Sequence, residues 1–553
     1  MANTGHSYAS FLLGGVNNAS LSKGIPYGLR SNYFGAFFQD DWKLTKKFTI
    51  NYGVRWEFQN PWNEVAGRTS ILDPAMPNPG AGNRPGALIF GDKNKRGFQK
   101  TYMAGFGPRL GLAYQLGENT VIRAGYGMFY APIIGNNLNF QGYAAAISVA
   151  SLDGGFTPAF NIDQGWPASL IQLPPFLNPT VANNQNTSLS ENCAGCSSRL
   201  PRSSQWQFGM QRTIKGVLFD ASYVGTVAHG IINNAMVRPN QLDPSLLRLG
   251  NLLRSNINSA EVRAAGYTPP YAGFNGSLAQ ALRAFPQYQD ITALATPTGN
   301  STYHGFLFKA ERRFANGLQF LVSYSASKTI TDVAFDANGT LASPQDQFNR
   351  RAEKSISNTD RPQRLVLAYT YEMPLGRGKK WMNRGVAGHI LGGFAVSAIQ
   401  EYQAAGPLRI TTPNGLPLFN GHLRPNRVAG APIRTGPGRA DFQPLNALSG
   451  QQGDILLNRD AFAVPNPFTL GNLGVFLPDV RGFGTRSEDI SIFKRQPLGA
   501  ETMRVLEIRA DFFNAFNRRN LSNPITDLSN PNFGRITGQG QPRAIQLGLR
   551  VDF

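Results

Sequence analysis

Hydrophobic and polar residues alternate with a period of two near the start of the chain, from Lys47 to Phe58. Ile50, Tyr52 and Val54 are among the apolar positions, and the residues between them are polar, charged or glycine. Such alternation predicts a β-strand with one apolar face and one solvated face. Because residues 31–42 show the same pattern before a short polar link, the two segments are predicted to form a long β-hairpin.

The same alternation recurs in five further pairs of segments and in one terminal segment. The predicted hairpins are 107–130, 203–227, 306–327, 365–402 and 489–513, and the last strand is 544–553. Most links within hairpins are short, whereas links between hairpins are long, and loops above about 12–15 residues are uncommon in compact domains. Short turns that alternate with long loops are typical of outer-membrane barrels, while sandwiches and propellers have more even spacing.

Composition agrees with a barrel and excludes helical membrane spans. Charged residues make up only 16% of the 553 residues, against roughly 25% in an average soluble protein. No window offers the roughly 18 consecutive apolar residues that a transmembrane helix needs. The formal charge of +20 is not gathered into a dense Lys/Arg block with interleaved aromatic residues, so no nucleic-acid partner is predicted.

Two cysteines, Cys193 and Cys196, form a CAGC sequence in a polar segment. A thioredoxin-like redox site needs a strand before this motif and a helix after it, and neither pattern is visible. Zinc would need further ligands, but the five histidines are scattered. We therefore interpret the pair as a small loop disulfide formed in an oxidising compartment.

No catalytic group of residues stands out. The adjacent carboxylates Asp40 and Asp41 lie in a predicted strand, where neighbouring side chains point to opposite faces and cannot converge on one substrate. We predict that the protein is not an enzyme and that it uses no cofactor or metal.

A basic stretch between residues 403 and 440 contains arginine but neither Asp nor Glu. The planar guanidinium group suits recognition of phosphates and carboxylates. The candidate ligand-binding residues are Arg424, Arg427, Arg434 and Arg439. The pattern favours a solvated loop without a ligand, and the alternative is that these residues contact an anionic ligand or lipopolysaccharide phosphates.

Seven stretches follow one another along nearly the whole chain and together are similar to one known family. They are YFGAFFQDDWKLTKKFTINYGVRWEF from Tyr33, GPRLGLAYQLGENTVIRAGYGMFY from Gly107, NGLQFLVSYSASKTI from Asn316, DRPQRLVLAYTYEMPLGRGKKW from Asp360, LGGFAVSAIQEYQAAGPL from Leu391, RADFFNAFNRRN from Arg509 and the terminal strand. In this order they resemble the C-terminal barrel region of TonB-dependent outer-membrane receptors, in particular the Oar-like branch. The resemblance implies a plugged outer-membrane barrel that takes up scarce ligands with energy from the inner membrane.

The sequence departs from that family at its start. It shows no signal peptide, plug, TonB-box segment or N-terminal carboxypeptidase-regulatory-like domain. We therefore interpret residues 1–553 as the C-terminal portion of a receptor β-barrel, from which the plug domain and signal peptide are absent. The predicted fold is all-β, an antiparallel transmembrane β-barrel with about 13–14 strands of a larger barrel, short periplasmic turns and long extracellular loops.

Strand parity supports the interpretation as a portion of a barrel. Bacterial barrels have an even number of strands with both chain ends on the periplasmic side. The six hairpins and the last strand give an odd number, so a further strand must precede residue 31, and only residues 7–16 are available for it. Since the resemblance implies the plugged class with roughly 22 strands, we expect two unpaired edges.

The terminal strand carries a second signal. An aromatic residue at the end of an alternating strand resembles the assembly signal of outer-membrane barrels. The residues that would face lipid or the assembly machinery are Leu547, Leu549, Val551 and Phe553. An ordinary edge strand that ends with the chain is the alternative.

The predicted function is that of an outer-membrane receptor or transporter barrel for energised uptake of a scarce ligand, located in the outer membrane of a Gram-negative-type envelope. The predicted partners are outer-membrane lipid and lipopolysaccharide, the barrel-assembly machinery, and a TonB-type energy coupler acting through the missing plug. The alternative is a soluble, secreted, β-rich glycan-binding protein. The two differ because a barrel exposes its apolar faces to lipid, whereas a soluble fold must bury them.

Overall fold

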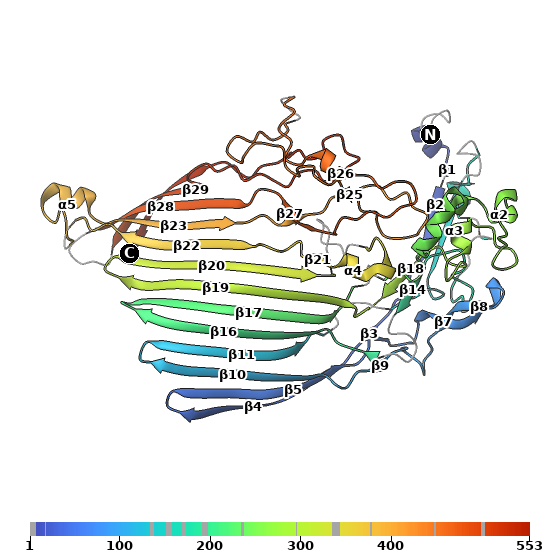
Figure 1. The fold of residues 1–553 in the computed structure, drawn as a ribbon, viewed down its shortest axis with the longest axis horizontal. Coiled ribbons are helices and arrows are strands. Elements are labelled where there is room, and N and C mark those ends of the chain that lie inside the picture. The colour runs from blue at the N-terminus through green and yellow to red at the C-terminus, as the bar shows by residue number, and fades with distance from the viewer. Residues whose placement is uncertain are drawn as a thin grey trace.

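The computed structural model is organised around one large antiparallel sheet (Figure 1). Its long strands are β4 (Tyr33–Thr45), β5 (Phe48–Gln59), β10 (Phe106–Gly117), β11 (Thr120–Tyr130), β16 (Arg202–Ile214), β17 (Val217–Ile231), β19 (Gly299–Ala315), β20 (Leu318–Thr331), β22 (Gln363–Glu372), β23 (Phe394–Gln403), β28 (Thr485–Pro497), β29 (Val505–Phe513) and β30 (Ala544–Asp552). Each strand pairs with its neighbours in chain order, and the short β21 (Ser355–Ile356), which pairs with β20, completes a 14-stranded sheet. The predicted hairpins and terminal strand are therefore confirmed.

The structure describes the chain from residue 7 to residue 552 with several gaps. The described ranges are 7–16, 18–132, 138–150, 157–166, 168, 173–190, 197–233, 237–294, 296–333, 343–376, 379–446, 450–498 and 504–552.

Two of the short turns show why the hairpins are tight. Asn316 and Gly317 have φ values of 53° and 79°, and Lys215 and Gly216 have φ values of 49° and 78°. Two successive left-handed residues make the turn that matches the twist of paired strands, and Asn-Gly is the preferred sequence for it. These turns all lie at one end of the sheet, and the long loops lie at the other (Figure 1).

The expected strand over residues 7–16 is wrong. Ser7–Leu12 forms the helix α1, which is followed by Gly14 at φ 71° and by the two-residue β1 (Gly15–Val16). β1 pairs with β13 (Phe160–Asn161) in the long-loop region and adds nothing to the main sheet. The physical reason is local, because this segment has a continuous apolar run instead of alternation, and a left-handed glycine ends the helix.

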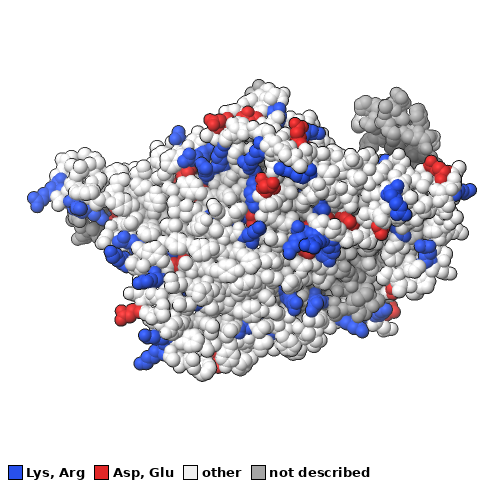
Figure 2. Space-filling view, viewed as in Figure 1, with Lys and Arg blue, Asp and Glu red and all other residues white. Residues whose placement is uncertain are grey.

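The register of the main sheet places the apolar residues of successive strands on one face. Phe208 of β16, for example, lies opposite Ala124 of β11 and Tyr223 of β17. Its side chain is 58% exposed, and Leu549 of β30 is 72% exposed. A continuous exposed apolar surface of this extent indicates contact with lipid or a partner. In Figure 2 the surface over the strands is mostly uncharged, and charged atoms gather toward the strand ends and the loops.

The long loops are folded and contain small elements of their own. The other strands are β2 (Asn18–Lys23), β3 (Leu29–Arg30), β6 (Asn63–Glu64), β7 (Ser70–Asn78), β8 (Arg84–Phe90), β9 (Lys100–Thr101), β12 (Ala145–Ala150), β14 (Thr187–Ser190), β15 (Ser197–Ser198), β18 (Ile291–Leu294), β24 (Pro407–Leu408), β25 (Asn426–Arg427), β26 (Phe462–Ala463) and β27 (Leu477–Arg481). The other helices are α2 (Ala260–Ala264), α3 (Leu278–Ala281), α4 (Arg350–Glu353), α5 (Gly385–Leu391) and the 3₁₀ helices Pro79–Ala81, Ile162–Gln164, Pro244–Arg254, Gln347–Asn349 and Arg459–Ala461.

Neighbouring long loops share hydrophobic cores. One core joins Leu72 and Leu88 with Tyr288 and Ile291, which belong to a loop far along the chain. A second core buries Leu418 against the loop between β17 and β19, and a third joins the β23–β28 loop to the β29–β30 loop. The long loops therefore form one connected layer at their end of the sheet, which we call the loop layer.

Candidate functional site

The inner face of the sheet, opposite the exposed apolar face, is polar and carries ion pairs. Arg364 Nε lies 2.8 Å from Glu401 Oε1 across β22 and β23, and Arg509 Nε lies 2.7 Å from Asp511 Oδ1 along β29. Exposed pairs of this kind contribute at most about 1 kcal/mol each to stability, so their main effect is on the character of the surface. The inner wall therefore presents charges of both signs, which suits an aqueous path or a polar protein segment.

Apolar side chains also lie on this inner wall. Phe37 and Ile399 are 73% and 60% exposed, although they share the inward orientation of polar neighbours. Phe37 lines a cavity of about 260 Å³ together with Asn51, Arg55 and Arg109. The wall therefore offers apolar contact points between its charged groups.

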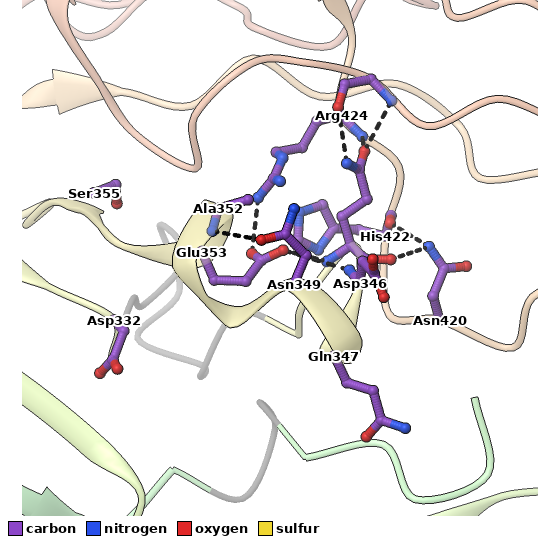
Figure 3. A network of polar contacts seen from close by, with 12 residues as sticks. Asp332, Asp346, Gln347, Asn349, Ala352, Glu353, Ser355, Asn420, His422 and Arg424 are labelled. Carbon is purple, nitrogen blue, oxygen red and sulfur yellow. Dashed lines mark hydrogen bonds and ion pairs between the residues drawn. The ribbon is translucent and has the colours of Figure 1, made fainter. Parts of the chain in front are cut away.

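A buried polar network lies in the loop layer (Figure 3). Arg424 Nη1 donates to Glu353 Oε2 at 2.8 Å, and the two side chains are 4% and 1% exposed. Gln345 adds a second link. Its side-chain oxygen accepts a hydrogen bond from the backbone N–H of Arg424 at 2.7 Å, and its backbone N–H donates to Glu353 Oε1 at 3.1 Å. These bonds join the β20–β22 loop to the β23–β28 loop.

Other polar contacts extend the same connection. Gln241 Nε2, from the β17–β19 loop, donates to Asp346 Oδ1 at 2.9 Å. Arg481 Nη2 lies 2.8 Å from Asp360 Oδ2, whose side chain is 1% exposed. Because buried charges with partners resist separation, these contacts hold three long loops in one arrangement.

His422 lies inside this network (Figure 3). Burial, followed by the neighbouring cations Arg409 and Arg424, lowers the pKa of its imidazole to about 3. The ring is therefore neutral at physiological pH, and a proton added to it would lie beside two positive charges.

The four candidate arginines fall into different environments. Arg424 is committed to Glu353, as described above. The Arg427 amide donates to Asn472 at 2.8 Å, and its guanidinium lies over the Phe462 ring. Arg434 and Arg439 come together, each with its guanidinium 5.9 Å from the centre of the Phe483 ring. The structure thus groups two of the four and separates the other two.

Two of the candidates have a buried guanidinium nitrogen without a hydrogen-bond partner among the described residues, Arg424 at Nε and Arg439 at Nη2. Burial lowers the pKa of Arg439, and the nearby Arg486 and Arg518 lower it further. Arg518 pairs with the fully buried Glu488 at 3.2 Å. Arg439 therefore lies near two further cations, of which one is paired with a carboxylate, at the long-loop end of β28.

This arginine cluster (Arg439, Arg486 and Arg518) lies on the outer side of the wall. Arg486 belongs to β28, where it has the same parity as the outward-facing Ile490 and Ile492. Side chains of one parity share a face of a strand. The cluster is therefore placed where the apolar outer face meets the loop layer.

Comparison with known families decides the class of this molecule. A family model described as an outer membrane β-barrel domain matches residues 1–546. The chain belongs to this family. It is a barrel protein of the outer membrane, and the soluble glycan-binding alternative is set aside.

Solved structures with a similar arrangement share little sequence with this barrel chain. The pyoverdine receptor FpvA from Pseudomonas aeruginosa PAO1 is 10% identical with a TM-score of 0.41, covering 96% of this chain and 44% of that one. The outer membrane transporter YddB from Escherichia coli is 11% identical with a TM-score of 0.38, covering 95% and 54%. The ferric yersiniabactin uptake receptor FyuA from Yersinia pestis is 10% identical with a TM-score of 0.36, covering 97% and 47%. The barrel chain thus spans about half the length of these proteins, and no curated protein matches it.

The remaining predicted residues lie at the barrel's margins or outside the described ranges. Leu547, Leu549 and Val551 lie on the outward face of β30 and are exposed. Phe553 lies outside the described residues, as do Cys193 and Cys196, so the disulfide stays a prediction. Asp40 accepts from the Tyr52 hydroxyl at 3.1 Å and Asp41 accepts from Asn51, so the two carboxylates face opposite sides of the strand.

Neither metal chemistry nor a helical span is indicated in the described part of the barrel chain. No group of three or more His, Cys, Asp or Glu residues there is placed to hold a metal ion. Among the described residues, no helix is long and apolar enough to cross a membrane.

Sequence reasoning missed Glu353 and Gln345. Glu353 lies in the short helix α4, within a sequence of mixed charge that carries no motif. Its partner Arg424 lies in another loop, and a contact between distant loops leaves no local signal in one sequence. An alignment with paired changes at these two positions is the signal that would reveal them.

Proposed function

We propose that this protein is a receptor and transporter barrel of the Oar-like branch of TonB-dependent receptors, which takes up a scarce ligand with energy from the inner membrane. The observation that carries the proposal is the division of the wall into two faces. A lipid-exposed outer face, a polar inner face and a folded loop layer over one end are the parts that a ligand path across the outer membrane requires.

The loop layer supports a receptor role more than a simple pore. Its loops share hydrophobic cores and the buried Glu353–Arg424 pair, so they hold a defined shape. A defined surface allows selective binding, because loops that are already ordered lose little conformational entropy when a ligand binds.

We further propose that residues 1–553 form the C-terminal portion of the barrel. Among the described residues, β4 pairs only with β5 and β30 pairs only with β29 in the main sheet. Unpaired backbone groups in hydrocarbon cost several kcal/mol each, so a spanning sheet must close on further strands. Refolding residues 1–553 in detergent is the test. Aggregation, or the absence of a band whose gel mobility changes on boiling, is expected, whereas a protease-resistant, heat-modifiable species would contradict this proposal.

Exposed apolar residues on the inner wall support the proposal that a plug domain binds to this portion of the barrel. Phe37 and Ile399 are exposed apolar residues on a face that is otherwise polar. A folded plug would cover such residues and pair with the wall's charged groups. Through that plug a TonB-type coupler would supply the energy for uptake.

Uptake is tested with a deletion strain and a panel of labelled iron chelates, copper chelates and oligosaccharides. Loss of uptake of one ligand, its recovery on complementation and its abolition by an uncoupler of the inner-membrane potential are expected. Flux that continues unchanged with the uncoupler would contradict energised transport and leave a passive channel.

The arginine cluster favours a contact with lipopolysaccharide phosphates. It lies on the outer side of the wall, and Arg439 Nη2 has no partner among the described residues. Arg439→Gln should weaken retention of lipopolysaccharide in the purified protein, and Arg427→Gln serves as the control because it lies outside the cluster. Equal retention by both variants and the wild type would favour the solvated-loop alternative.

A further inference from the structure

The link between β22 and β23 differs from the other short-turn links because it contains the helix α5. Figure 1 shows α5 protruding beyond the turns at the short-turn end of the sheet. Val386 and Ile390, four residues apart on one side of this helix, are 74% and 60% exposed. Trp381 and Met382, just before the helix, are also more than half exposed. Exposed apolar residues that gather at the end of a membrane wall indicate an interaction site.

The contacts of α5 place it on the lipid side of the wall. Lys494 Nζ, from β28, donates to the carbonyl oxygens of His389 and Ile390 at 2.7 and 2.9 Å. Lys494 has the parity of Ile492, whose side chain faces outward, so the ammonium group reaches the helix along the outer face. The Phe394 ring, 5.6 Å from Lys494 Nζ, lies at the same position. The last turn of α5 is therefore tied to the lipid-facing surface and not to the lumen.

Positive charge accompanies the apolar residues. No Asp or Glu occurs from residue 373 to residue 400. Lys379 is paired with Glu372 at 2.9 Å, whereas Lys380 and Arg384 are exposed, and Lys380 Nζ lies over the Trp381 ring at 5.4 Å. Figure 2 shows Lys and Arg atoms on this protruding end. A Trp with neighbouring cations is the pattern that binds the interface between acyl chains and phosphate headgroups.

We propose that the α5 link, residues 379–391, is a lipid-binding foot that inserts into the headgroup region of the periplasmic leaflet. Trp381, Val386 and Ile390 would enter the boundary of the acyl chains, and Lys380 and Arg384 would bind the phosphates of anionic phospholipid. This inference depends on the outer-membrane barrel fold and not on the proposed uptake.

Continuity with the wall selects lipid as the occupant. The outer residues of β22 and β23 next to the link, the exposed Tyr371 and the half-buried Phe394, already belong to the outward face of the sheet. A bilayer that contacts this face must also surround the end from which α5 protrudes. The two cations of the link complement the phosphates of a phospholipid surface, and its apolar residues complement the acyl chains.

A fluorescent probe on the foot tests the proposal. Ala387→Cys, on exposed helix surface, is labelled with an environment-sensitive fluorophore in a Cys193→Ser, Cys196→Ser background. Glu118→Cys, in the β10–β11 turn at the same end of the sheet, is the matched control. The barrel that contains residues 1–553 together with the strands proposed to complete it is purified from outer membranes and reconstituted into phosphatidylethanolamine vesicles with or without phosphatidylglycerol. Quenching by aqueous iodide and by lipids with brominated acyl chains is then measured.

The probe at position 387 should be shielded from iodide and quenched by brominated lipid, and the probe at position 118 should show the reverse. Val386→Ser with Ile390→Ser should remove the shielding while heat-modifiability is retained. Lys380→Gln with Arg384→Gln should retain insertion but lower the local preference for phosphatidylglycerol by roughly fivefold for each charge removed. Equal iodide quenching at positions 387 and 118 in both kinds of vesicle would overturn the proposal. Shielding that occurs only when periplasmic extract is added would also overturn it, because the occupant would then be a protein.

Discussion

Replacing Phe208 by Arg tests the assignment of the two faces of the wall, with Gln207→Arg as its control. Phe208 is the seventh of the 13 residues of β16 and faces outward, whereas Gln207 faces inward beside Gly125. The two positions differ in depth by one residue, so membrane depth is nearly constant and only the face changes. Gly125 leaves room for a longer side chain at position 207.

The expected magnitude follows from the position in the strand. Six residues of β16 lie on either side of Phe208. With a rise of about 3.4 Å per residue and a strand tilt of about 40°, each half of the strand extends roughly 16 Å along the membrane normal. Since the apolar band is about 25 Å tall, Phe208 lies close to its middle. Arg at the midplane of a lipid face costs about 2–4 kcal/mol. Gln207→Arg on a hydrated face should change the free energy of unfolding by no more than about 0.5 kcal/mol.

Denaturant titration measures the difference. The barrel that contains residues 1–553 and the strands proposed to complete it is unfolded in lipid vesicles with guanidinium chloride, tryptophan fluorescence is followed, and the free energy of unfolding is obtained by linear extrapolation. Relative to the wild type, Phe208→Arg should change the unfolding equilibrium constant roughly 30- to 900-fold, and Gln207→Arg by no more than about twofold. Equal destabilisation by the two variants would show that the outward face is not in contact with lipid. The assignment of the two faces of the sheet from strand parity would then be wrong.

Four further predictions concern the loops and the terminal strand. Arg424→Ala leaves Glu353 buried without its cation, so the loop layer should lose about 3–5 kcal/mol and be cleaved faster by protease, while adding Glu353→Ala should restore part of the loss; cleavage at the wild-type rate would contradict the buried pair. The pKa of His422 is lowered in the folded protein, so loop stability is complete above pH 6.5 and should fall by up to about 1.4 kcal/mol per unit as pH decreases toward 3. Proteolysis at pH 7 and pH 5 measures this loss, which His422→Asn should abolish, and a wild-type rate independent of pH would argue against the burial of the ring. Cys193→Ser with Cys196→Ser should leave folding and uptake nearly unchanged, and stoichiometric zinc bound through the cysteines would refute their assignment as a disulfide. In the barrel completed by the strands proposed to precede this portion, Phe553→Ala should lower the amount of heat-modifiable protein in outer membranes without changing its synthesis, and an unchanged amount would indicate an ordinary edge strand.

The sequence alone determined the wall of this protein. Period-two alternation is a local property, because the pleat of a strand assigns each residue to a face without reference to distant residues. Turn sequences such as Asn316-Gly317 are equally local, since they need only their own left-handed geometry. The strands, their order and their faces were predictable for these reasons, and the long-loop asymmetry then indicated a membrane barrel. Residues 7–16 were assigned wrongly because strand parity was applied to a segment without alternation.

The loop layer was decided only by the tertiary structure. The sequence shows these loops as irregular stretches rich in Pro and Gly, yet Leu418 is buried against a loop that precedes it by more than a hundred residues. The same holds for the arginines: a stretch without Asp or Glu suggested candidate contacts for an anion, but Arg424 is neutralised by Glu353 and Arg439 lies beside other cations. Whether a charged side chain is free or committed depends on partners brought together by folding, and Coulomb interactions and desolvation act through space and not along the chain.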